Sequence, residues 1–415
     1  MKQFIDVNER IPLNQGLPLS FQHLFAMFGS TVLVPILVGL DPSIALFAGG
    51  LGTLIYILVT KGKIPAYLGS SFAFITPLAT VIKTQGIGAA LYGALLSGIL
   101  YVIIALLIAK FGVTWLERLL PPIVVGPIII VIGLSLAGTA IGMASKSYLV
   151  AFVALVIAVL ANTYFKGFLA VIPILLGIVG GYLFALTQGI VNLAPIGNAR
   201  WLQLPHFAAP HISSIAAWTI APVALVTIAE HIGHLLVTEN IVGRNFMKDP
   251  GLHRSILGDG IATIVAGAIG GPPTTTYGEN IGVMAITRVY SVWVIGGAAC
   301  IAIAFSFIGK LNALISSIPV PVMGGISILL FGIIAASGLR MLVESKVDFG
   351  SKRNLSIASI IMVLGVGNAV FHIHGLEIGN MAIATLVGIV LNLILPDDQK
   401  SPSGEKEKLG DKKIA

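Results

Sequence analysis

Apolar runs of about 20 residues recur along nearly the whole chain, and they restrict its fold more than any other feature. A helix needs roughly 20 residues to cross the ~30 Å hydrocarbon core of a bilayer. Charged residues make up 10% of the 415 residues, whereas soluble proteins carry about 25%. The mean hydropathy is +0.99. The pattern predicts an all-α polytopic membrane protein, because a membrane barrel would show short alternating segments instead.

We place fourteen transmembrane segments along the chain. They lie near residues 17–37, 43–60, 68–83, 87–109, 121–141, 147–165, 168–187, 215–238, 255–270, 274–287, 290–309, 319–339, 354–370 and 378–395. With both termini in the cytoplasm, thirteen basic loop residues lie inside and four outside, as the positive-inside rule requires. The same rule explains the net charge of +7 without nucleic acid binding. We expect a multi-pass protein of the plasma membrane, which in a bacterium is the inner membrane.

The two halves of the sequence repeat each other weakly. Segment 122–126 matches segment 321–325 at one constant offset, and segment 62–65 matches segment 270–273 at a second offset. Such internal repeats are typical of transporters. Fourteen spans give seven in each half, and an odd number of spans forces the second half to be inverted. The sequence therefore predicts a 7+7 inverted repeat.

Spans 3 and 10 contain unusual segments, 63–74 and 271–280, at corresponding places in the two repeats. Each has proline, then residues that favour extended backbone, then glycine before the helical pattern resumes. We interpret both as broken spans, in which short antiparallel extended segments lead into half-helices that start near Ser70 and Gly278. Half-helix starts aim free N–H groups and positive dipole ends at the centre of the membrane. The alternative is a pair of kinked helices packed through small residues.

Glu279 lies in the first turn of the second half-helix, inside an otherwise apolar run. An acid at that depth is costly unless something binds it or protonates it. Its position indicates a site for a polar solute, where the carboxylate accepts hydrogen bonds from N–H donors. The alternative is a structural carboxylate paired with a neighbouring helix.

Glu230 and His234 are four residues apart and share one helix face. A His-Glu pair in a low-dielectric region is suited to sharing or relaying a proton. A zinc site of the His-Glu-x-x-His type is disfavoured because the acid precedes both histidines here. We expect His231, on another face, to be a hydrogen-bonded packing residue. Asp259 is expected to be buried, where it either supports the glutamates' surroundings or only packs.

Several further polar or aromatic residues each allow two interpretations. His23, beside Gln22, is expected to make helix contacts rather than contact a ligand. Phe72, just after the first break, either offers an aromatic face to a planar solute or packs in the bundle. Ser70 and Ser71 either help to bind the solute or cap their half-helix.

At these residues the chain resembles the nucleobase:cation symporter-2 family, also called nucleobase–ascorbate transporters, and within it most closely the bacterial uracil permeases. The family signature is matched by Glu279-Asn280-Ile281-Gly282 through Thr287-Arg288, and the family's Gln-His pair by Gln22-His23. The resemblance covers about residues 8–396, and the Glu-Asn-x-Gly signature is highly specific.

The resemblance implies a core domain of spans 1–4 and 8–11 and a gate domain of spans 5–7 and 12–14. Residues 1–16 would form a cytoplasmic N-terminus and 397–415 a disordered cytoplasmic tail. The core domain would consist of 17–110 and 215–310, and the gate domain of 119–187 and 317–396. Residues 188–214 would form an extracellular loop.

By this resemblance, together with the patterns above, a substrate site is expected at Glu230, Glu279, Phe72, Gly278, Ser30, Ser71 and Tyr277. Proton coupling is expected at Glu230, His234 and Glu279, with support from Asp259, Asn280, Gln22 and His23. The backbone at Phe72 and Gly278 would meet substrate carbonyls, and Tyr277 would line the approach. Ser30 departs from the alanine of close relatives and could add a hydrogen bond.

The expected function is secondary active import of uracil by proton symport, with alternating access by rocking of the core against the gate. Uracil offers two N–H donors and two carbonyl acceptors, which two carboxyl groups and two half-helix ends complement. Alternatives are a xanthine or urate symporter of the same family, an anion transporter of the related inverted-repeat fold, and a membrane-embedded enzyme. We expect no enzymatic activity, no cofactor and no metal. Glycine-rich faces in spans 5 and 12 are compatible with a homodimer and equally with packing inside the chain.

Overall fold

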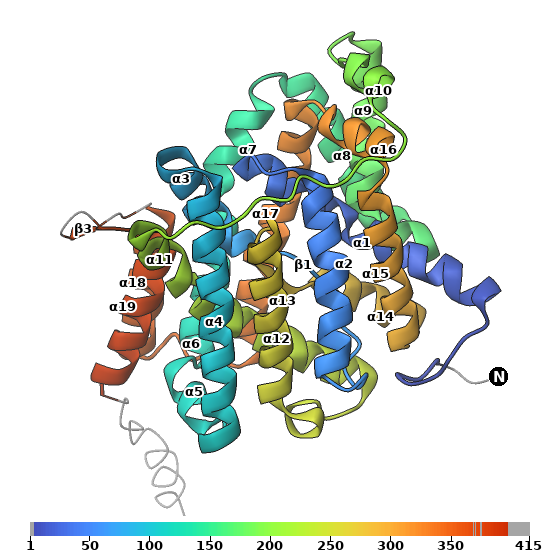
Figure 1. Ribbon diagram of the computed structural model, residues 1–415. Helices are drawn as coiled ribbons and strands as arrows, with labels where there is room; N and C mark the ends of the chain where they lie inside the picture. Colours follow the sequence, from blue (N-terminus) through green and yellow to red (C-terminus); the bar gives the residue numbers. More distant parts are fainter. Residues whose placement is uncertain (1–3, 368, 370, 374–375, 397–415) are drawn as a thin grey trace, which may run out of the picture.

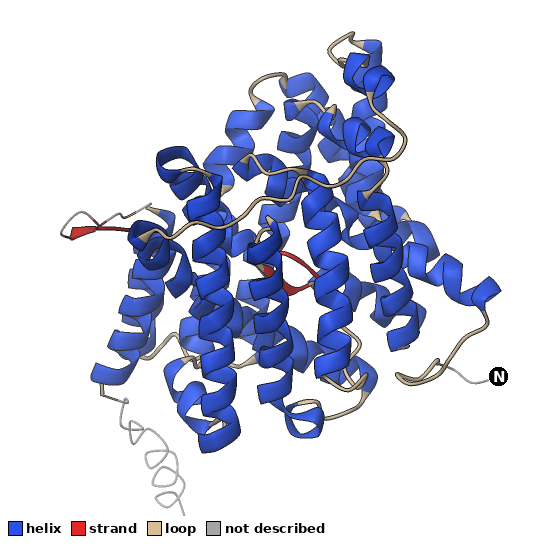
Figure 2. Ribbon diagram, in the orientation of Figure 1, coloured by secondary structure: helices blue, strands red, loops and turns tan. Residues whose placement is uncertain are grey.

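Helices make up most of the molecule, and a small pair of strands lies among them (Figures 1 and 2). The computed structural model describes residues 4–367, 369, 371–373 and 376–396, so the expected tail at 397–415 lies outside the described residues. The first part of the chain forms α1 (Leu13–Val38), α2 (Pro42–Val59), β1 (Leu68–Ser70), η1 (Phe72–Phe74), α3 (Ile75–Gln85), α4 (Ile87–Phe111), α5 (Thr114–Leu119), α6 (Pro122–Ser135), α7 (Ala137–Ala144), α8 (Tyr148–Tyr164), η2 (Gly167–Val171), α9 (Pro173–Thr187) and α10 (Ala194–Asn198).

The second part of the chain begins after a long connection. It forms α11 (Ser214–Ile220), η3 (Ala221–Val223), α12 (Ala224–Val242), η4 (Met247–Gly251), α13 (Leu252–Ile269), β2 (Thr274–Thr276), α14 (Gly278–Thr287), α15 (Val292–Ser306), α16 (Gly309–Ser316), α17 (Val320–Glu344), α18 (Lys352–Val366), β3 (Phe371–Ile373), β4 (Leu376–Ile378) and α19 (Asn380–Ile394).

Length and composition allow several of these helices to cross a membrane. Among the described residues, six stretches are both long and apolar enough: Leu13–Val38, Pro42–Val59, Ile87–Phe111, Pro122–Ala144, Ser214–Val242 and Val320–Glu344. Shorter apolar helices lie at Tyr148–Tyr164, Pro173–Thr187, Val292–Ser306 and Asn380–Ile394. The prediction of a helical protein with many apolar spans is confirmed at this level.

Helix, or a strand followed by helix, occupies every range in which the sequence placed a span. The sequence missed the short helices α5, α10 and α16 and the hairpin of β3 and β4. These elements are too short to give a periodic pattern that stands out from a connecting loop. The description all-α with extended segments in two broken spans is therefore corrected by the antiparallel β3–β4 pair, which lies outside those spans.

The turn between α1 and α2 shows how local sequence sets helix ends. Gly39 ends α1 with a φ of 81°, a conformation that costs little without a side chain. Asp41 then caps α2 by accepting a hydrogen bond of 2.8 Å from the Ser43 N–H, and Pro42 takes the first helical position. Gly, Asp and Pro in this order therefore reverse the chain between two apolar helices.

The helices form two sets that pack mainly within themselves (Figure 1). In the first set α13 lies against α4 and α2, and α15 lies against α2 and α1. In the second set α17 lies against α6, α7 and α8, while α18 lies against α6 and α19. We call these the α13 set and the α17 set.

Glycine permits the closest helix approach in each set. A Cβ on Gly98 of α4 would lie 2.7 Å from the Gly260 carbonyl oxygen of α13, and one on Gly338 of α17 would lie 2.6 Å from the Gly126 carbonyl oxygen of α6. Both distances are too short for any side chain. These glycines of α6 and α17 therefore serve packing within the chain, one of the two uses the sequence left open.

The strands β1 and β2 pair in antiparallel fashion, with Gly69 opposite Thr275, near the middle of the molecule (Figure 2). The preceding helix holds each strand through a buried threonine. The Leu68 N–H donates to Thr53 Oγ1 of α2 at 2.9 Å, and the Thr274 N–H donates to Thr263 Oγ1 of α13 at 3.2 Å. Extended backbone at this depth is tolerable because protein groups satisfy its N–H groups. The expected antiparallel extended segments are thus present.

The first described residues form part of the packed structure. Ile5 forms a parallel bridge with Val289, in the connection between α14 and α15, and Asp6 pairs with Arg244 at 2.6 Å. Helix α1 begins at Leu13, four residues before the predicted start at residue 17. The start of the described chain and the end of α19 lie at the same end of the molecule in Figure 1.

Candidate functional site

Two short helices start beside the strand pair, and their starts define the site. Helix α14 begins at Gly278, directly after β2, as the sequence predicts. The other begins with η1 at Phe72 and not near Ser70, so that prediction is wrong by two residues. The reason is pairing, because Ser70 is still opposite Thr274 and the Ser71 N–H donates to the Pro273 carbonyl oxygen at 3.0 Å.

Glu279 lies in the first turn of α14 and is half-buried. Its Oε1 accepts a hydrogen bond from the Ser30 hydroxyl of α1. The positive end of the α14 dipole stabilises a carboxylate at this position. Glu279 is therefore held from two sides while part of its surface stays open.

Glu230 comes from α12, and its surroundings are less complete. Its Oε2 is buried and has no hydrogen-bond partner among the described residues. Its carboxyl is close enough to Glu279 and Asp259 for their charges to interact. A buried polar atom without a partner is costly, and a ligand that donates a hydrogen bond removes that cost.

His234, one turn after Glu230, faces the start of α14. Its Nδ1 is 3.2 Å from the Thr276 hydroxyl of β2. Its Nε2 is 3.3 Å from the position that a Cβ would take on Gly278. The glycine therefore leaves space for the imidazole, and α12, β2 and α14 meet at this point.

His231 of α12 and Asp259 of α13 are more deeply buried than His234. The expectation that His231 lies on another helix face is wrong, because residues three apart are neighbours on a helix and both imidazoles lie near the Thr276 hydroxyl. His231 is 1% exposed, its Nε2 is 2.7 Å from the Ser255 hydroxyl, and its Nδ1 is 3.1 Å from Asp259 Oδ2. Ser255 in turn is 2.6 Å from the Tyr56 hydroxyl of α2. His231 is thus the hydrogen-bonded packing residue that the sequence suggested, and the buried Asp259 contacts it.

Asn280 fastens α14 to α1. Its side-chain amide nitrogen is 3.1 Å from His23 Nδ1 and donates to the His23 carbonyl oxygen at 3.1 Å. His23 therefore makes the helix contact that we expected, and Gln22 beside it is buried. His23 thus lies where α14 packs against α1.

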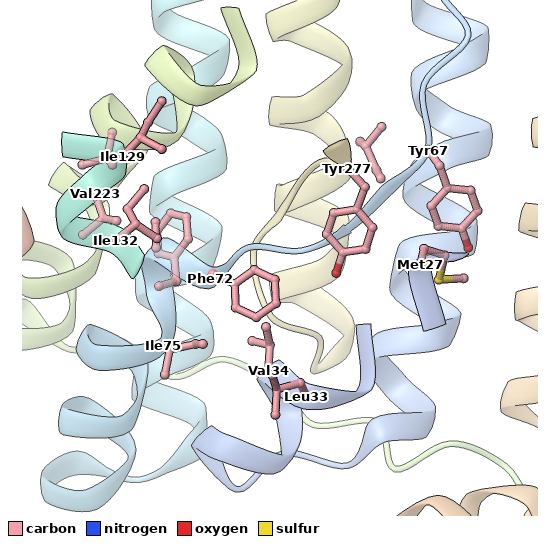
Figure 3. Packing of buried hydrophobic residues seen from close by; sticks show 14 of the residues in the cluster. Met27, Leu33, Val34, Tyr67, Phe72, Ile75, Ile129, Ile132, Val223 and Tyr277 are labelled. Atoms are coloured by element: carbon pink, nitrogen blue, oxygen red, sulfur yellow. The ribbon is translucent and has the colours of Figure 1, made fainter. Parts of the chain in front are cut away.

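Phe72 and Tyr277 lie within a cluster of apolar side chains that includes α1 and α6 residues (Figure 3). Phe72 is 9% exposed and packs edge-to-face on Phe331 of α17, so the packing reading of this residue fits better than an open aromatic face. The Tyr277 hydroxyl donates to the Ser70 carbonyl oxygen at 3.0 Å and is 3.3 Å from the Thr31 hydroxyl. Its ring therefore braces the strand pair.

Ser70 and Ser71 do not cap the first half-helix. Both hydroxyls are buried and form no hydrogen bond within the described part of the chain. The capping alternative is thus wrong: Ser71 directly precedes η1, yet its side chain makes no hydrogen bond to the N–H groups of that helix.

Sequence reasoning missed the hydroxyl groups that connect these residues. Thr276 lies between two histidines, and Ser255 and Tyr56 extend the contacts of His231. A weak signal existed, since Thr274 to Thr276 form a run of hydroxyl side chains beside an acid. That run indicates extended backbone, but it does not say which hydroxyl meets which partner.

The site offers a ligand both hydrogen-bond acceptors and hydrogen-bond donors. Two carboxyl groups offer acceptors, and the starts of η1 and α14 offer N–H donors. Neither glutamate forms an ion pair with Lys or Arg in the described ranges of the chain. No three His, Cys, Asp or Glu side chains among those residues are placed as a metal site. The site suits a small neutral ligand with both donors and acceptors.

Comparison with solved structures identifies the fold. The transmembrane domain of the cyanobacterial bicarbonate transporter BicA aligns over 93% of this chain and 99% of its own length, with a TM-score of 0.58 and 14% identity. The murine anion transporter Slc26a9, in the inward-facing state, aligns over 95% of this chain and 68% of its own, with a TM-score of 0.70 and 11% identity. At such identities the likeness concerns the fold of these membrane transporters alone.

Comparison of sequences identifies the family. The sequence model Xan_ur_permease, described as a permease family, matches residues 14–373. The chain is 56% identical over 409 residues to the uracil permease of Bacillus subtilis (strain 168), covering 94% of each protein. It is 51% identical over 404 residues to the uracil permease of Escherichia coli (strain K12), covering 95% of this chain and 94% of the relative. This multi-pass membrane protein therefore belongs to the permease family Xan_ur_permease, that is, to the nucleobase:cation symporter-2 family.

Proposed function

We propose that this protein imports uracil across the plasma membrane by proton symport. The observation that carries the proposal is that Glu230 of α12, whose buried Oε2 has no hydrogen-bond partner among the described residues, lies within range of the charge of Glu279 in the first turn of α14. Two relatives that are more than half identical to this chain over almost their whole length are named uracil permeases.

Uracil fits the chemical capacity of the site. Its two N–H groups match the carboxylates of Glu279 and Glu230, and its two carbonyl groups match the N–H donors near Phe72 and Gly278. The partnerless Glu230 Oε2 gains a donor when the ligand binds. In this proposal Ser30, Ser71 and Tyr277 complete the surroundings, while the contact of Asn280 with His23 holds α14 against α1 and Gln22 supports it from the neighbouring position of α1.

A coupled ion follows from the neutrality of the ligand. The membrane potential is worth about 2.3 kcal/mol per elementary charge per 100 mV, and it acts only on charge. Uracil alone gains nothing from it. We infer that a carboxyl group that takes up a proton together with the ligand supplies the coupling, and that His234, one turn after Glu230, exchanges this proton with the glutamates.

We also infer the layout of the transporter from these features. Fourteen spans form a 7+7 inverted repeat, with core halves at 17–110 and 215–310 and gate halves at 119–187 and 317–396. The α13 set corresponds to the core and the α17 set to the gate. The antiparallel β1–β2 pair supports the inversion, since equivalent segments of inverted halves run in opposite directions. Both termini then lie in the cytoplasm, and 188–214 lies outside.

A cavity of about 220 Å³ between α12 and the α17 set supports movement of the inferred core against the gate. Its walls include Leu116 of α5, Val125 of α6, Gly233 and Leu236 of α12, and Met341 of α17. The α12 residues lie beside Glu230 in sequence. In the inferred layout this space lies on the cytoplasmic side, where rocking of the core would open a passage.

The decisive experiment is uptake of radiolabelled uracil into proteoliposomes with an imposed pH gradient. We expect accumulation that collapses when a protonophore removes the gradient. Glu230→Gln and Glu279→Gln should each lower uptake by roughly 100-fold, because each removes a charged hydrogen-bond acceptor worth about 1.5–3 kcal/mol. Glu344→Gln, at an exposed site on α17, is the matched control and should transport normally. Undiminished uptake by both site variants would refute the proposal.

Two alternatives give different results in the same vesicles. A purine symporter of this family would show uracil uptake abolished by excess xanthine or urate, whereas we expect inhibition by uracil analogues. The fold is shared with proteins named as bicarbonate and anion transporters. An anion transporter would carry bicarbonate or chloride, yet two acids without a Lys or Arg partner oppose anion binding here.

A further inference from the structure

We propose that the Thr276 hydroxyl relays the coupled proton during its release, from His234 at the substrate site to the buried pair of His231 and Asp259. The inference rests on the proposed function and adds a route for the coupled proton. Thr276 Oγ1 is 3.2 Å from His234 Nδ1 and 3.5 Å from His231 Nδ1. Its hydroxyl therefore lies near a ring nitrogen of both imidazoles.

The backbone fixes the position of this hydroxyl. Thr276 ends β2 and is paired with Leu68 of β1, and the next N–H, that of Tyr277, donates to the Tyr67 carbonyl oxygen at 2.9 Å. Thr276 is 4% exposed. A buried β-branched side chain on paired backbone has few rotamers, so Oγ1 is held between the two rings.

Water is a poor substitute for this link. The cavity at this point, lined by Thr276, both histidines and Tyr56, has a volume of about 10 Å³. That is roughly the space of one water molecule, and a chain of waters needs more. A proton that passes here must therefore use side chains.

The proton balance of the step is simple. His234, as an imidazolium, gives its Nδ1 proton to Thr276 Oγ1, and the same hydroxyl gives its own proton to the unprotonated Nδ1 of a neutral His231. One O–H bond breaks and another forms, so Thr276 is unchanged, His234 has lost one proton and His231 has gained one. The imidazolium formed at His231 lies 3.1 Å from Asp259 Oδ2, whose negative charge stabilises it.

Other groups around the route are also part of its electrostatics. Glu230 and Glu279 face it from the substrate side, and Tyr56 reaches His231 through Ser255. Tyr101 of α4 interacts with the charges of both Asp259 and Glu230. The acids at the two ends differ in their contacts, because Asp259 contacts an imidazole while Glu279 contacts a hydroxyl. The proton thus moves from the side of the two glutamates to an imidazole that lies beside a different acid, Asp259.

The test compares Thr276→Val, Thr276→Ser and Thr275→Val in proteoliposomes. Valine keeps the shape of threonine and removes the hydroxyl, whereas serine keeps the hydroxyl. Thr275 is the matched control, since its neighbouring hydroxyl is buried and has no hydrogen-bond partner among the described residues. For each protein we would measure uracil binding, uracil exchange at equal pH on both sides, and accumulation driven by a pH gradient.

Exchange returns the carrier still loaded with its proton, so it does not need proton release. We expect Thr276→Val to bind and exchange uracil like the wild type but to lose roughly tenfold in gradient-driven accumulation and in accompanying proton uptake. Thr276→Ser and Thr275→Val should accumulate normally. Normal accumulation by Thr276→Val, or an equal loss of binding, exchange and accumulation, would overturn the relay.

The outcome for the relay is separable from that for the proposed function. Absence of gradient-driven uracil uptake by the wild-type protein contradicts proton-coupled uracil import itself. Normal wild-type uptake together with normal Thr276→Val uptake contradicts the relay alone.

Discussion

The strands β1 and β2 pair with each other and each leads into a short helix, yet the two helix starts have opposite chemistry. Helix η1 begins with Phe72, Ala73 and Phe74, all buried, whereas α14 begins with Gly278, Glu279 and Asn280. The first start packs against α17 through Phe331, and the second holds the acid and the amide of the site. The repeated backbone thus supplies N–H donors twice, while carboxyl chemistry is added at one start only.

The same contrast appears in how the two starts are fixed. At η1, fixation comes from apolar packing and strand pairing, because Ser70 and Ser71 make no side-chain hydrogen bonds within the described chain. At α14, fixation comes from polar contacts to α1, through Glu279 with Ser30 and through Asn280 with His23. Apolar packing tolerates small shifts, whereas hydrogen bonds are directional. The start of α14 is therefore held in position more precisely than the start of η1.

The largest expected effect comes from filling the space between Gly69 of β1 and the Tyr277 ring, which lies between the two helix starts. Gly69 is covered by the Tyr277 ring, and a Cβ there would overlap the ring atoms. Gly69→Ala should destabilise the protein by about 3 kcal/mol, since overpacking of this kind forces backbone shifts. Thermal unfolding in detergent and uracil binding would measure the effect. Gly282→Ala is the control, because no atom lies within 4 Å of a Cβ at Gly282. Equal stability of Gly69→Ala and wild type would show that the Tyr277 ring packs loosely on β1.

A second test asks whether the two strands are held equally. Thr53→Val and Thr263→Val each remove the hydroxyl that accepts from a buried strand N–H. Each should cost about 1–3 kcal/mol, the penalty of an unsatisfied buried group. The measurement is again thermal unfolding, with uracil transport as a second readout. A much larger loss of stability in one variant would show that the hydrogen bond to that strand contributes more to folding than the bond to the other strand.

The smallest expected effect concerns the acid itself. Ser30→Ala removes the hydroxyl that donates to Glu279, at a half-buried place where water can take over the hydrogen bond. We expect the KM for uracil to change by less than about tenfold, with the maximal rate nearly unchanged. A loss comparable to that of Glu279→Gln would mean that the hydroxyl orients the carboxylate, and the contrast between the two starts would be sharper still.

Much of the fold follows from local patterns in the sequence. Apolar length predicts the helices, and the prolines before Leu68 and Thr274 predict strands in place of continuous helix. The short amphipathic helices and the β3–β4 pair escaped prediction, because a few residues give no periodic signal. The first half-helix starts two residues after Ser70 because Ser70 is still paired with a strand about two hundred residues away, and the Ser71 N–H donates to the Pro273 carbonyl oxygen.

The site divides in the same way. The sequence identifies Glu230, Glu279 and His234 as unusual because polar groups in an apolar run are costly. It does not say that Phe72 would be covered by Phe331, nor that one hydroxyl would touch both histidines. Those contacts join residues that are far apart in the sequence, and the sequence alone does not select these partners from the many other side chains of the bundle.

The sequence by itself determined that this chain lies in a membrane as helices, that two of its spans are broken, and which acids are buried among apolar residues. Each of these depends on the transfer of neighbouring residues out of water, which local composition fixes. Only the tertiary structure decided that Ser30 meets Glu279, that Asn280 meets His23, and that Thr276 lies between His231 and His234. Hydrogen bonds act over about 3 Å, so they depend on how distant helices pack and not on the order of residues along one of them.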